Sequence, residues 1–126
     1  MKSVITASAI FILIIVLISV SVWYVNDFVD KMLQYLYKNE NYVAKNAWQD
    51  AEDEMDKMVS TWVERRHVMS VLFNHSFIDK LDVSIEKMKN ITQNQKKEDF
   101  FYEKSNFYLL LLNLQEQQKI SVGNIF

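Results

Sequence analysis

The sequence SVITASAIFILIIVLISVSVWYVN, residues 3–26, contains no charged side chain. A helix rises about 1.5 Å per residue, so these 24 residues extend about 36 Å, more than the roughly 30 Å of a bilayer's hydrocarbon core. Trp23 and Tyr24 lie at the far end, where amphipathic rings favour the membrane–water interface. The stretch predicts a transmembrane helix that contacts the lipid bilayer through residues 3–26.

A cleaved secretory signal and a helix packed inside a soluble fold are the alternatives to a retained anchor. Ser19–Ser21 resembles the small-x-small pattern of a cleavage site, but the apolar run continues to Val25, which favours an uncleaved signal anchor. Lys2 and the α-amino group favour a cytoplasmic N-terminus. Lysines after the stretch oppose this orientation, although long translocated domains largely escape the charge rule. We expect a single-pass protein of the cell membrane, with residues 1–26 as the anchor and residues 27–126 as one extracytoplasmic domain.

The composition of the chain favours helices and excludes several classes of site. It has one glycine, no proline and no cysteine. Turns and phosphate-binding loops depend on glycine and proline, and thiol catalysis, disulfides and cysteine-based zinc sites need cysteine. Beyond Lys2, 13 Lys and Arg face 16 Asp and Glu, a net charge of −3 that excludes a basic nucleic-acid-binding domain.

The helical period continues beyond the apolar stretch. Phe28, Met32 and Leu36 predict that the first helix extends past the membrane surface and ends at Asn39–Asn41. A second helix carries a heptad pattern, with spacings of 4, 3, 4, 3 and 4 between Ala44, Trp48, Ala51, Met55, Met58 and Trp62. Val59 and Val63 widen this apolar face. Arg65 interrupts the seam, so a kink near Glu64–His67 is an alternative to a straight helix.

Two further helices follow two predicted breaks. Ser76 is the expected N-cap of the third helix, whose apolar positions are Ile78, Leu81, Ile85 and Met88. Residues 90–97 form a polar connection, residues 107–114 (FYLLLLNL) belong to what should be the most buried helix, and residues 121–126 form a tail. The fold class is therefore all-α, with an N-terminal transmembrane helix continuing into an antiparallel bundle of three to four helices.

Two pairs of polar residues are candidate sites. Glu64 and His67 have the i, i+3 spacing of carboxylate-bridged metal bundles, but a complete site needs a second such motif and two more glutamates. His75 and Asp79 are four residues apart on a helix, which leaves three interpretations open: metal ligands, an imidazolium held by Asp79, or a polar cluster at the start of the helix. Histidine changes charge near neutral pH, which leaves a pH-sensing role open. We predict no catalytic, cofactor-binding or metal-binding residues.

Trp48, Trp62, Arg65 and Arg66 are the remaining candidates. The two tryptophans lie 14 residues apart on one seam and predict core anchors or, alternatively, a ligand platform. The two arginines form a surface pair or a site for a phosphate or a partner's carboxylate. The five carboxylates of Asp50–Asp56 lack the spacing of a calcium loop and predict a solvated helix face.

Several short features resemble one family: a single charged residue ahead of an apolar span, Trp48 and Trp62, H-x-x-I-D at residues 75–79, and the ending Asn124–Phe126. In these features the chain resembles a family of small single-span membrane proteins from Clostridia and related sporulating Firmicutes. The family is uncharacterised and is classed as a domain of unknown function. Its members are often encoded beside YetF-like multi-span membrane proteins. The resemblance implies a bacterial membrane protein, an accessory subunit with a YetF-like partner, and no catalytic residues.

The expected function is therefore non-enzymatic. We expect a membrane-anchored helical bundle that serves as an accessory or interaction subunit of a bacterial membrane protein complex. The alternative is an extracytoplasmic bundle that senses a ligand or pH. A heptad seam does not specify whose helix it faces, so a homo-oligomer is a further alternative.

Overall fold

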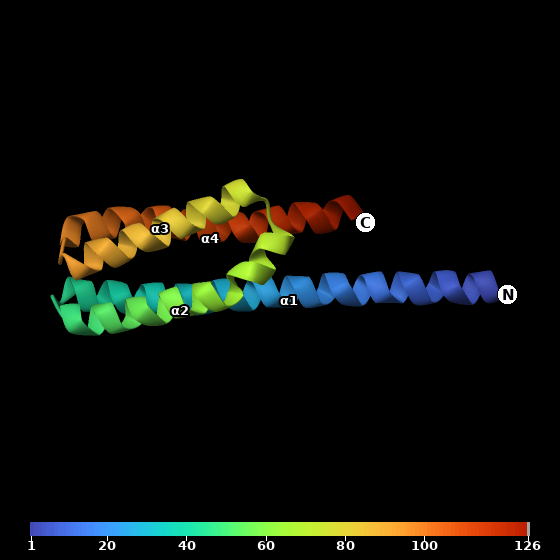
Figure 1. The fold of residues 1–126 in the computed structure, drawn as a ribbon, viewed down its shortest axis with the longest axis horizontal. Helices are drawn as coiled ribbons and strands as arrows, with labels where there is room; N and C mark the ends of the chain where they lie inside the picture. Colours follow the sequence, from blue (N-terminus) through green and yellow to red (C-terminus); the bar gives the residue numbers. More distant parts are fainter. Residues whose placement is uncertain (126) are drawn as a thin grey trace.

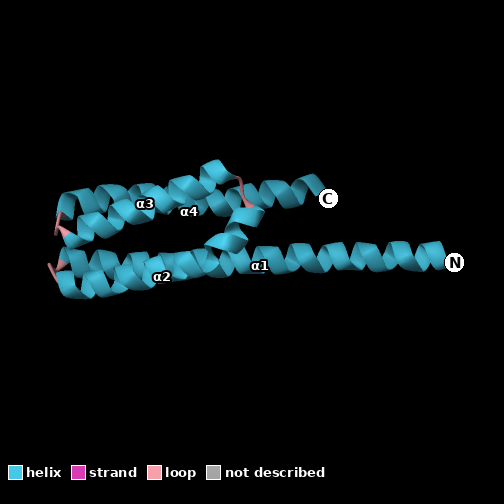
Figure 2. Ribbon diagram, in the orientation of Figure 1, coloured by secondary structure: helices cyan, strands magenta, loops and turns pink. Residues whose placement is uncertain are grey.

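The computed structural model describes residues 1–125, and these residues form four helices: α1 (Lys2–Ala44), α2 (Trp48–Leu72), α3 (His75–Gln93) and α4 (Lys97–Ile125). Figure 2 shows helices joined by short connections, without strands in the described part of the chain. Each helix packs against its neighbours in sequence, and α4 packs back against α1. The all-α prediction of a long apolar helix continuing into an antiparallel bundle is confirmed.

The core of the bundle consists of one apolar stripe from each helix. The stripe of α1 begins at Val25, so the last residues of the uncharged stretch already belong to the core. The largest fully buried side chains are Phe28, Phe100, Phe107, Met32, Met55, Met58, Met69, Ile78, Leu81, Met88, Leu111 and Leu114. The predicted core positions of the third helix are confirmed, and Phe107, Leu111 and Leu114 of the stretch 107–114 are buried as well.

The N-terminal part of α1 projects beyond the other three helices (Figure 1). Among the described residues, α1 alone is long and apolar enough to cross a membrane, with a mean hydropathy of 2.8 over its most apolar window. None of that window is buried in the bundle. The apolar stretch therefore has no protein partner within this chain for most of its length.

The predicted break at Asn39–Asn41 is wrong, because α1 continues to Ala44. Asn39 is fully buried, and its side-chain amide lies 3.6 Å from the sulfur of Met55 on α2. Val43, one turn later, is also buried. Packing of the next helical turn therefore outweighs the weak helix preference of asparagine. Ala44, expected to begin the heptad seam of α2, instead ends α1 and is exposed.

Two short turns of the same type lie at the end of the bundle remote from the N-terminus (Figure 1). In the first, the N–H of Ala47 donates to the carbonyl of Tyr42 at 2.8 Å, and in the second the N–H of Lys96 donates to the carbonyl of Ile91 at 3.1 Å. These i+5 to i hydrogen bonds are Schellman motifs, which need one residue in the left-handed region. Asn46 (φ 59°) and Gln95 (φ 55°) supply it, so the helices reverse direction without glycine.

The start of α3 and the end of α4 also differ from expectation. Asn74, not Ser76, caps α3, with its side-chain oxygen accepting from the N–H of Phe77 at 2.9 Å. The predicted polar connection 90–97 shrinks to three residues, because α3 extends to Gln93 and α4 begins at Lys97. Residues 121–125, expected to be a tail, are helical, and Phe126 lies outside the described residues.

Three predictions about burial are also wrong. α4 is not buried all round at 107–114, because Tyr108, Leu109 and Leu112 are exposed. Val63 does not widen the core seam, since 69% of it is exposed. Glu54, expected on a solvated face, is buried and pairs with Lys57 at 3.0 Å, which raises the pKa of that lysine. α2 stays helical through Glu64–His67, and Figure 1 shows its last turns leading away from α1 toward α3.

Candidate functional site: an apolar groove between α1 and α4

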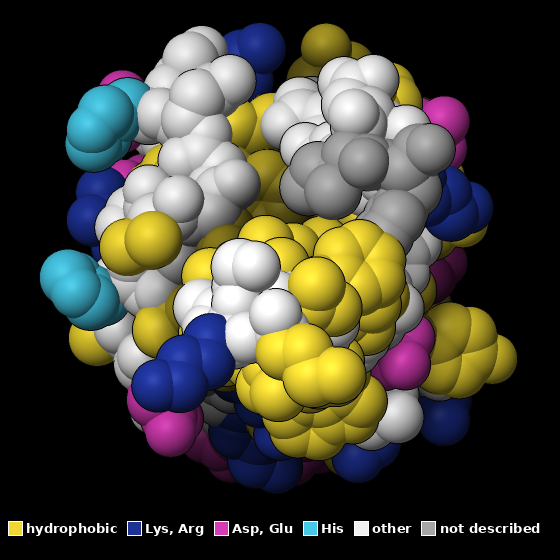
Figure 3. Space-filling model, turned by 90° about the vertical axis from the view of Figure 1, so that its right-hand side faces the viewer, with side chains coloured by type: hydrophobic (Ala, Val, Ile, Leu, Met, Phe, Trp, Pro, Cys, Tyr) yellow, Lys and Arg dark blue, Asp and Glu magenta, His cyan; other side chains and the backbone are white. Residues whose placement is uncertain are grey.

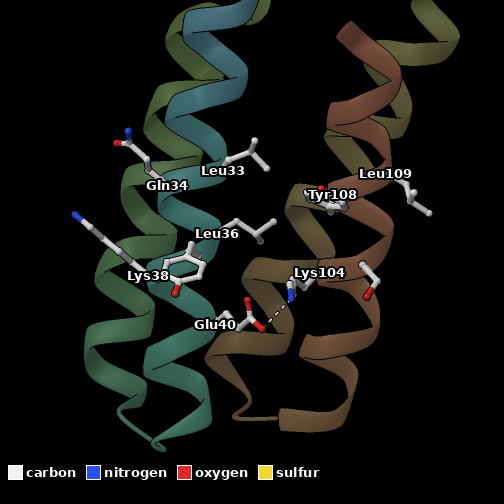
Figure 4. Close-up of a pocket in the computed structure, with 10 residues that line it drawn as sticks. Leu33, Gln34, Leu36, Lys38, Glu40, Lys104, Tyr108 and Leu109 are labelled. Atoms are coloured by element: carbon white, nitrogen blue, oxygen red, sulfur yellow. Dashed lines mark ion pairs between the residues drawn. The ribbon is translucent and has the colours of Figure 1, made fainter. Parts of the chain in front are cut away.

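α1 and α4 leave a groove of about 770 Å³ between them. In Figure 4, Leu33 and Leu36 of α1 point toward α4, and Tyr108 of α4 points back toward α1. The residues that line the groove are Leu33, Gln34, Leu36, Tyr37, Lys38, Glu40, Lys104, Ser105, Tyr108 and Leu109.

The groove exists because both helices carry apolar side chains beyond their core stripes. Phe107 and Leu111 fill the core from α4, and the adjacent Tyr108 and Leu109 remain 43% and 58% exposed. On α1, Tyr37 is 66% exposed beside the buried Leu36. Apolar patches that remain exposed in a folded domain mark sites of interaction more often than scattered single residues do.

One ion pair connects the two walls of the groove. Nζ of Lys104 lies 2.9 Å from Oε1 of Glu40, and both side chains are about one-quarter to one-third exposed (Figure 4). An ion pair of this exposure contributes at most about 1 kcal/mol to stability. Its larger effect is on shape, because it links α1 to α4 toward the end of the groove that is nearer the two short turns.

The structure places Trp62 and Arg66 on the same partner, Asp82 of α3. The indole N–H of Trp62 donates to Oδ1 of Asp82 at 2.7 Å, and the guanidinium of Arg66 donates to both carboxylate oxygens at 2.7–3.1 Å. These donors, Arg66 first, hold the pKa of Asp82 below its usual value. Trp62 is buried and its ring lies 5.7 Å from that of Phe28.

Arg65 points to α1 instead. Its Nη2 donates to Oδ2 of Asp27 at 2.7 Å, and its guanidinium lies 4.9 Å from the ring centroid of Tyr24. The hydrogen bond from Arg65, assisted by Lys31, lowers the pKa of Asp27. The two arginines therefore do not form one anion site, because each is bound to an aspartate on a different helix.

The other candidate residues are dispersed. Trp48 is partly buried at the margin of the core. His75 and Asp79 are both exposed, and within the described residues the structure forms no hydrogen bond or ion pair between them. Glu64 and His67 are exposed, and residues 1–125 contain no cluster of His, Asp or Glu suited to holding a metal.

Sequence reasoning missed the groove and the two aspartates that bind the arginines. Tyr37, Tyr108 and Leu109 are apolar residues that stand outside the heptad positions, and that mismatch is the signal that could have indicated an exposed apolar face. Asp27 and Asp82 had no comparable signal, since they lie 38 and 16 residues from their arginines.

Comparison with known families adds one assignment. A family model described as a domain of unknown function, DUF4363, matches residues 19–125. The chain belongs to this family. The DUF4363 region includes α1 from residue 19 onward, all of α2, α3 and α4, and the groove, so it contains only the last turns of the uncharged stretch. This confirms that the chain belongs to an uncharacterised family. No curated protein and no solved structure matches the chain.

Proposed function

We propose that this DUF4363 protein is a non-enzymatic, membrane-anchored helical bundle that binds another membrane protein as an accessory subunit. The observation that carries the proposal is the apolar groove on α1, a helix that is continuous with the uncharged stretch. A helix that leaves the membrane beside residues 3–26 of this chain and continues straight would run alongside the same α1.

The lining of the groove suits a helical partner. Amphipathic helices bind in hydrophobic grooves through apolar residues spaced by one turn. Tyr37, Tyr108 and Leu109 provide the exposed apolar surface, and tyrosine is enriched at protein–protein interfaces. Gln34, Lys38 and the Glu40–Lys104 pair supply polar atoms around it.

Anchoring and orientation belong to the same proposal. The exposed apolar half of α1 supports a single-pass signal anchor, and Lys2 supports a cytoplasmic N-terminus with the bundle outside. Because the chain lacks cysteine, a Lys45→Cys variant carries one thiol at the far end of the bundle. A membrane-impermeant maleimide should label it in intact cells, and labelling only after lysis would reverse the orientation.

The groove is tested with a photo-crosslinking amino acid placed at Tyr37 or Tyr108 in the full-length protein in its native membrane. We expect both positions to crosslink to one membrane protein, which mass spectrometry identifies. Val63 and Val83 are exposed apolar positions outside the groove and serve as matched controls. Equal crosslinking from all four positions, or none from the groove, would contradict the proposal.

A second set of variants separates docking from proximity. Leu109→Asp places a charge in the groove and should reduce the crosslink from Tyr37 at least tenfold, whereas Val63→Asp should leave it unchanged. The resemblance to bacterial proteins encoded beside YetF-like membrane proteins makes a YetF-like protein the first partner to test. If Tyr37 and Tyr108 crosslink only to a second copy of the chain, the groove binds another copy in a homo-oligomer and not a separate membrane protein.

Ligand sensing is the second candidate, and the volume of the groove favours it. Small-molecule sites commonly enclose about 300–1,000 Å³ and are mostly apolar, which the groove matches at about 770 Å³. A small molecule that raises the melting temperature of the wild type but not of Leu109→Asp would support this function.

A further inference from the structure

The two ends of the bundle differ in charge. The end with the two short turns carries Lys45, Lys96, Lys97, Glu98 and Asp99. The opposite end contains residues 68–78 (VMSVLFNHSFI), here called the elbow, and residues 120–125 (ISVGNI), here called the α4 end, and neither has a Lys, Arg, Asp or Glu. Figure 1 shows the elbow and the C-terminus on the side toward which the N-terminal half of α1 projects.

Apolar side chains of the elbow and the α4 end are exposed. Val71 is 77% exposed, Ile120 57%, Val68 42% and Leu72 38%. Figure 3 looks along the projecting α1 onto this end of the molecule, so hydrophobic side chains of α1 lie nearest the viewer and most charged side chains lie toward the rim. Exposed apolar patches of this kind mark surfaces that contact a partner protein or a membrane.

The position of this surface along α1 favours the membrane as its partner. Leu72 and Phe73 of the elbow, with Val122 of α4, line a hollow of about 240 Å³ against α1. The α1 side of the hollow is Leu17, Ile18, Ser21 and Val22, all within the uncharged stretch. A bilayer core needs about 20 helical residues, so residues 3–22 fill it and the elbow lies level with its outer edge.

We infer that the elbow and the α4 end form a second membrane contact, in which Val71, Leu72 and Ile120 enter the boundary between lipid headgroups and acyl chains. The inference rests on the proposed anchoring by residues 3–26. The bundle then stands end-on against the bilayer and is held at three places, by α1, the elbow and the α4 end. Its charged end points into water, and the α1–α4 groove lies between the two.

The test uses the full-length protein in vesicles of phosphatidylcholine and phosphatidylglycerol, with no other protein present. Single-cysteine variants Val71→Cys and Ile120→Cys are spin-labelled, and accessibility to oxygen, which partitions into lipid, is compared with accessibility to a water-soluble nickel chelate. Ile12→Cys is the reference inside the membrane stretch. Val83→Cys, 53% exposed and located midway along α3, is the matched aqueous reference.

We expect oxygen accessibility to exceed nickel accessibility at residues 71 and 120, as at residue 12, and the order to reverse at residue 83. If residue 12 is in lipid while residues 71 and 120 behave like residue 83, the second contact is refuted and the anchor stands. If residue 12 is also aqueous, the anchor itself fails and the second contact fails with it. Low accessibility to both reagents at residues 71 and 120 would indicate protein–protein burial and also refute the lipid contact. Circular dichroism of each variant checks that the helices are intact.

Discussion

Two residues in the turns adopt a backbone conformation that L-amino acids avoid. Asn46 has φ 59° and Gln95 has φ 55°. Asparagine tolerates the left-handed region because its short polar side chain bonds locally, but glutamine lacks that advantage. The residue that ends a helix by the Schellman motif is usually glycine. The backbone of Gln95 is therefore in a left-handed conformation that its side chain disfavours.

Replacing Gln95 with glycine should stabilise the protein. Gln95→Gly removes the steric penalty of the left-handed region, which outweighs the added flexibility of the unfolded chain by up to about 1 kcal/mol. Thermal or denaturant unfolding in detergent, followed by circular dichroism, measures the change. Glu86→Gly, at an exposed position in the interior of α3, is the matched control and should destabilise by roughly 0.5–1 kcal/mol. A loss of stability in both variants would contradict the argument.

At the scale of helices, the boundaries depend on caps and on packing. α3 begins where the side-chain oxygen of Asn74 accepts a hydrogen bond at 2.9 Å from the N–H of Phe77, which reaches the backbone carbonyl of Asn74 only at 3.2 Å. α1 continues through Asn39 because Leu36, Asn39 and Val43 all face the core. A helix thus ends where its next turn has nothing to pack against and a capping group is available.

The cap of α3 gives a prediction with an internal control. Asn74→Ala should lower the free energy of unfolding by about 1 kcal/mol, because the N–H of Phe77 loses the shorter of its two hydrogen bonds and keeps only the one to the backbone carbonyl of residue 74. Ser76→Ala should change it little, since Ser76 is exposed and its side chain makes no capping bond in this structure. Denaturant titration of the two variants measures the difference. An equal loss in both would restore Ser76 as the cap.

At the scale of the whole molecule, α2 is tied to both of its neighbours by ion pairs in the half of the bundle nearer the apolar stretch. Arg65 binds Asp27 of α1, and Arg66 binds Asp82 of α3. The pKa of each aspartate is lowered by its arginine. A group with a lowered pKa contributes stability that is present above its unfolded pKa and is lost as the pH falls through its folded pKa.

The stability of the bundle should therefore fall with pH below about 4, the usual pKa of aspartate. Asp82→Asn should lower the melting temperature at pH 7, by an amount equivalent to about 1 kcal/mol or less because Asp82 is one-third exposed and screened by water. The same variant should show a shallower loss between pH 4 and pH 2, measured by thermal unfolding in detergent. Glu86→Gln, an exposed change on the same helix, should keep the wild-type pH profile. Identical profiles for wild type and Asp82→Asn would contradict the assignment.

Amino-acid pattern was sufficient for the helical class, the number of helices to within one, and most of the core. The near absence of glycine and proline and the apolar period of three to four residues are local properties, and helices are made of local hydrogen bonds. Met55, Met58, Leu81 and Leu111 were placed correctly for that reason. The sequence also identified the one helix among the described residues that is long and apolar enough to cross a membrane, because length and composition are local properties.

The candidate site depended on the tertiary structure. Arg65 and Arg66 are adjacent in sequence yet bind different helices, and the α1–α4 groove joins residues about 70 positions apart. Burial of Glu54, exposure of Leu109 and the end of α1 beyond Asn39 follow from which helix lies alongside, and helical period does not encode that choice. Local pattern decides which residues are helical, whereas the contacts between helices decide which faces remain free to bind.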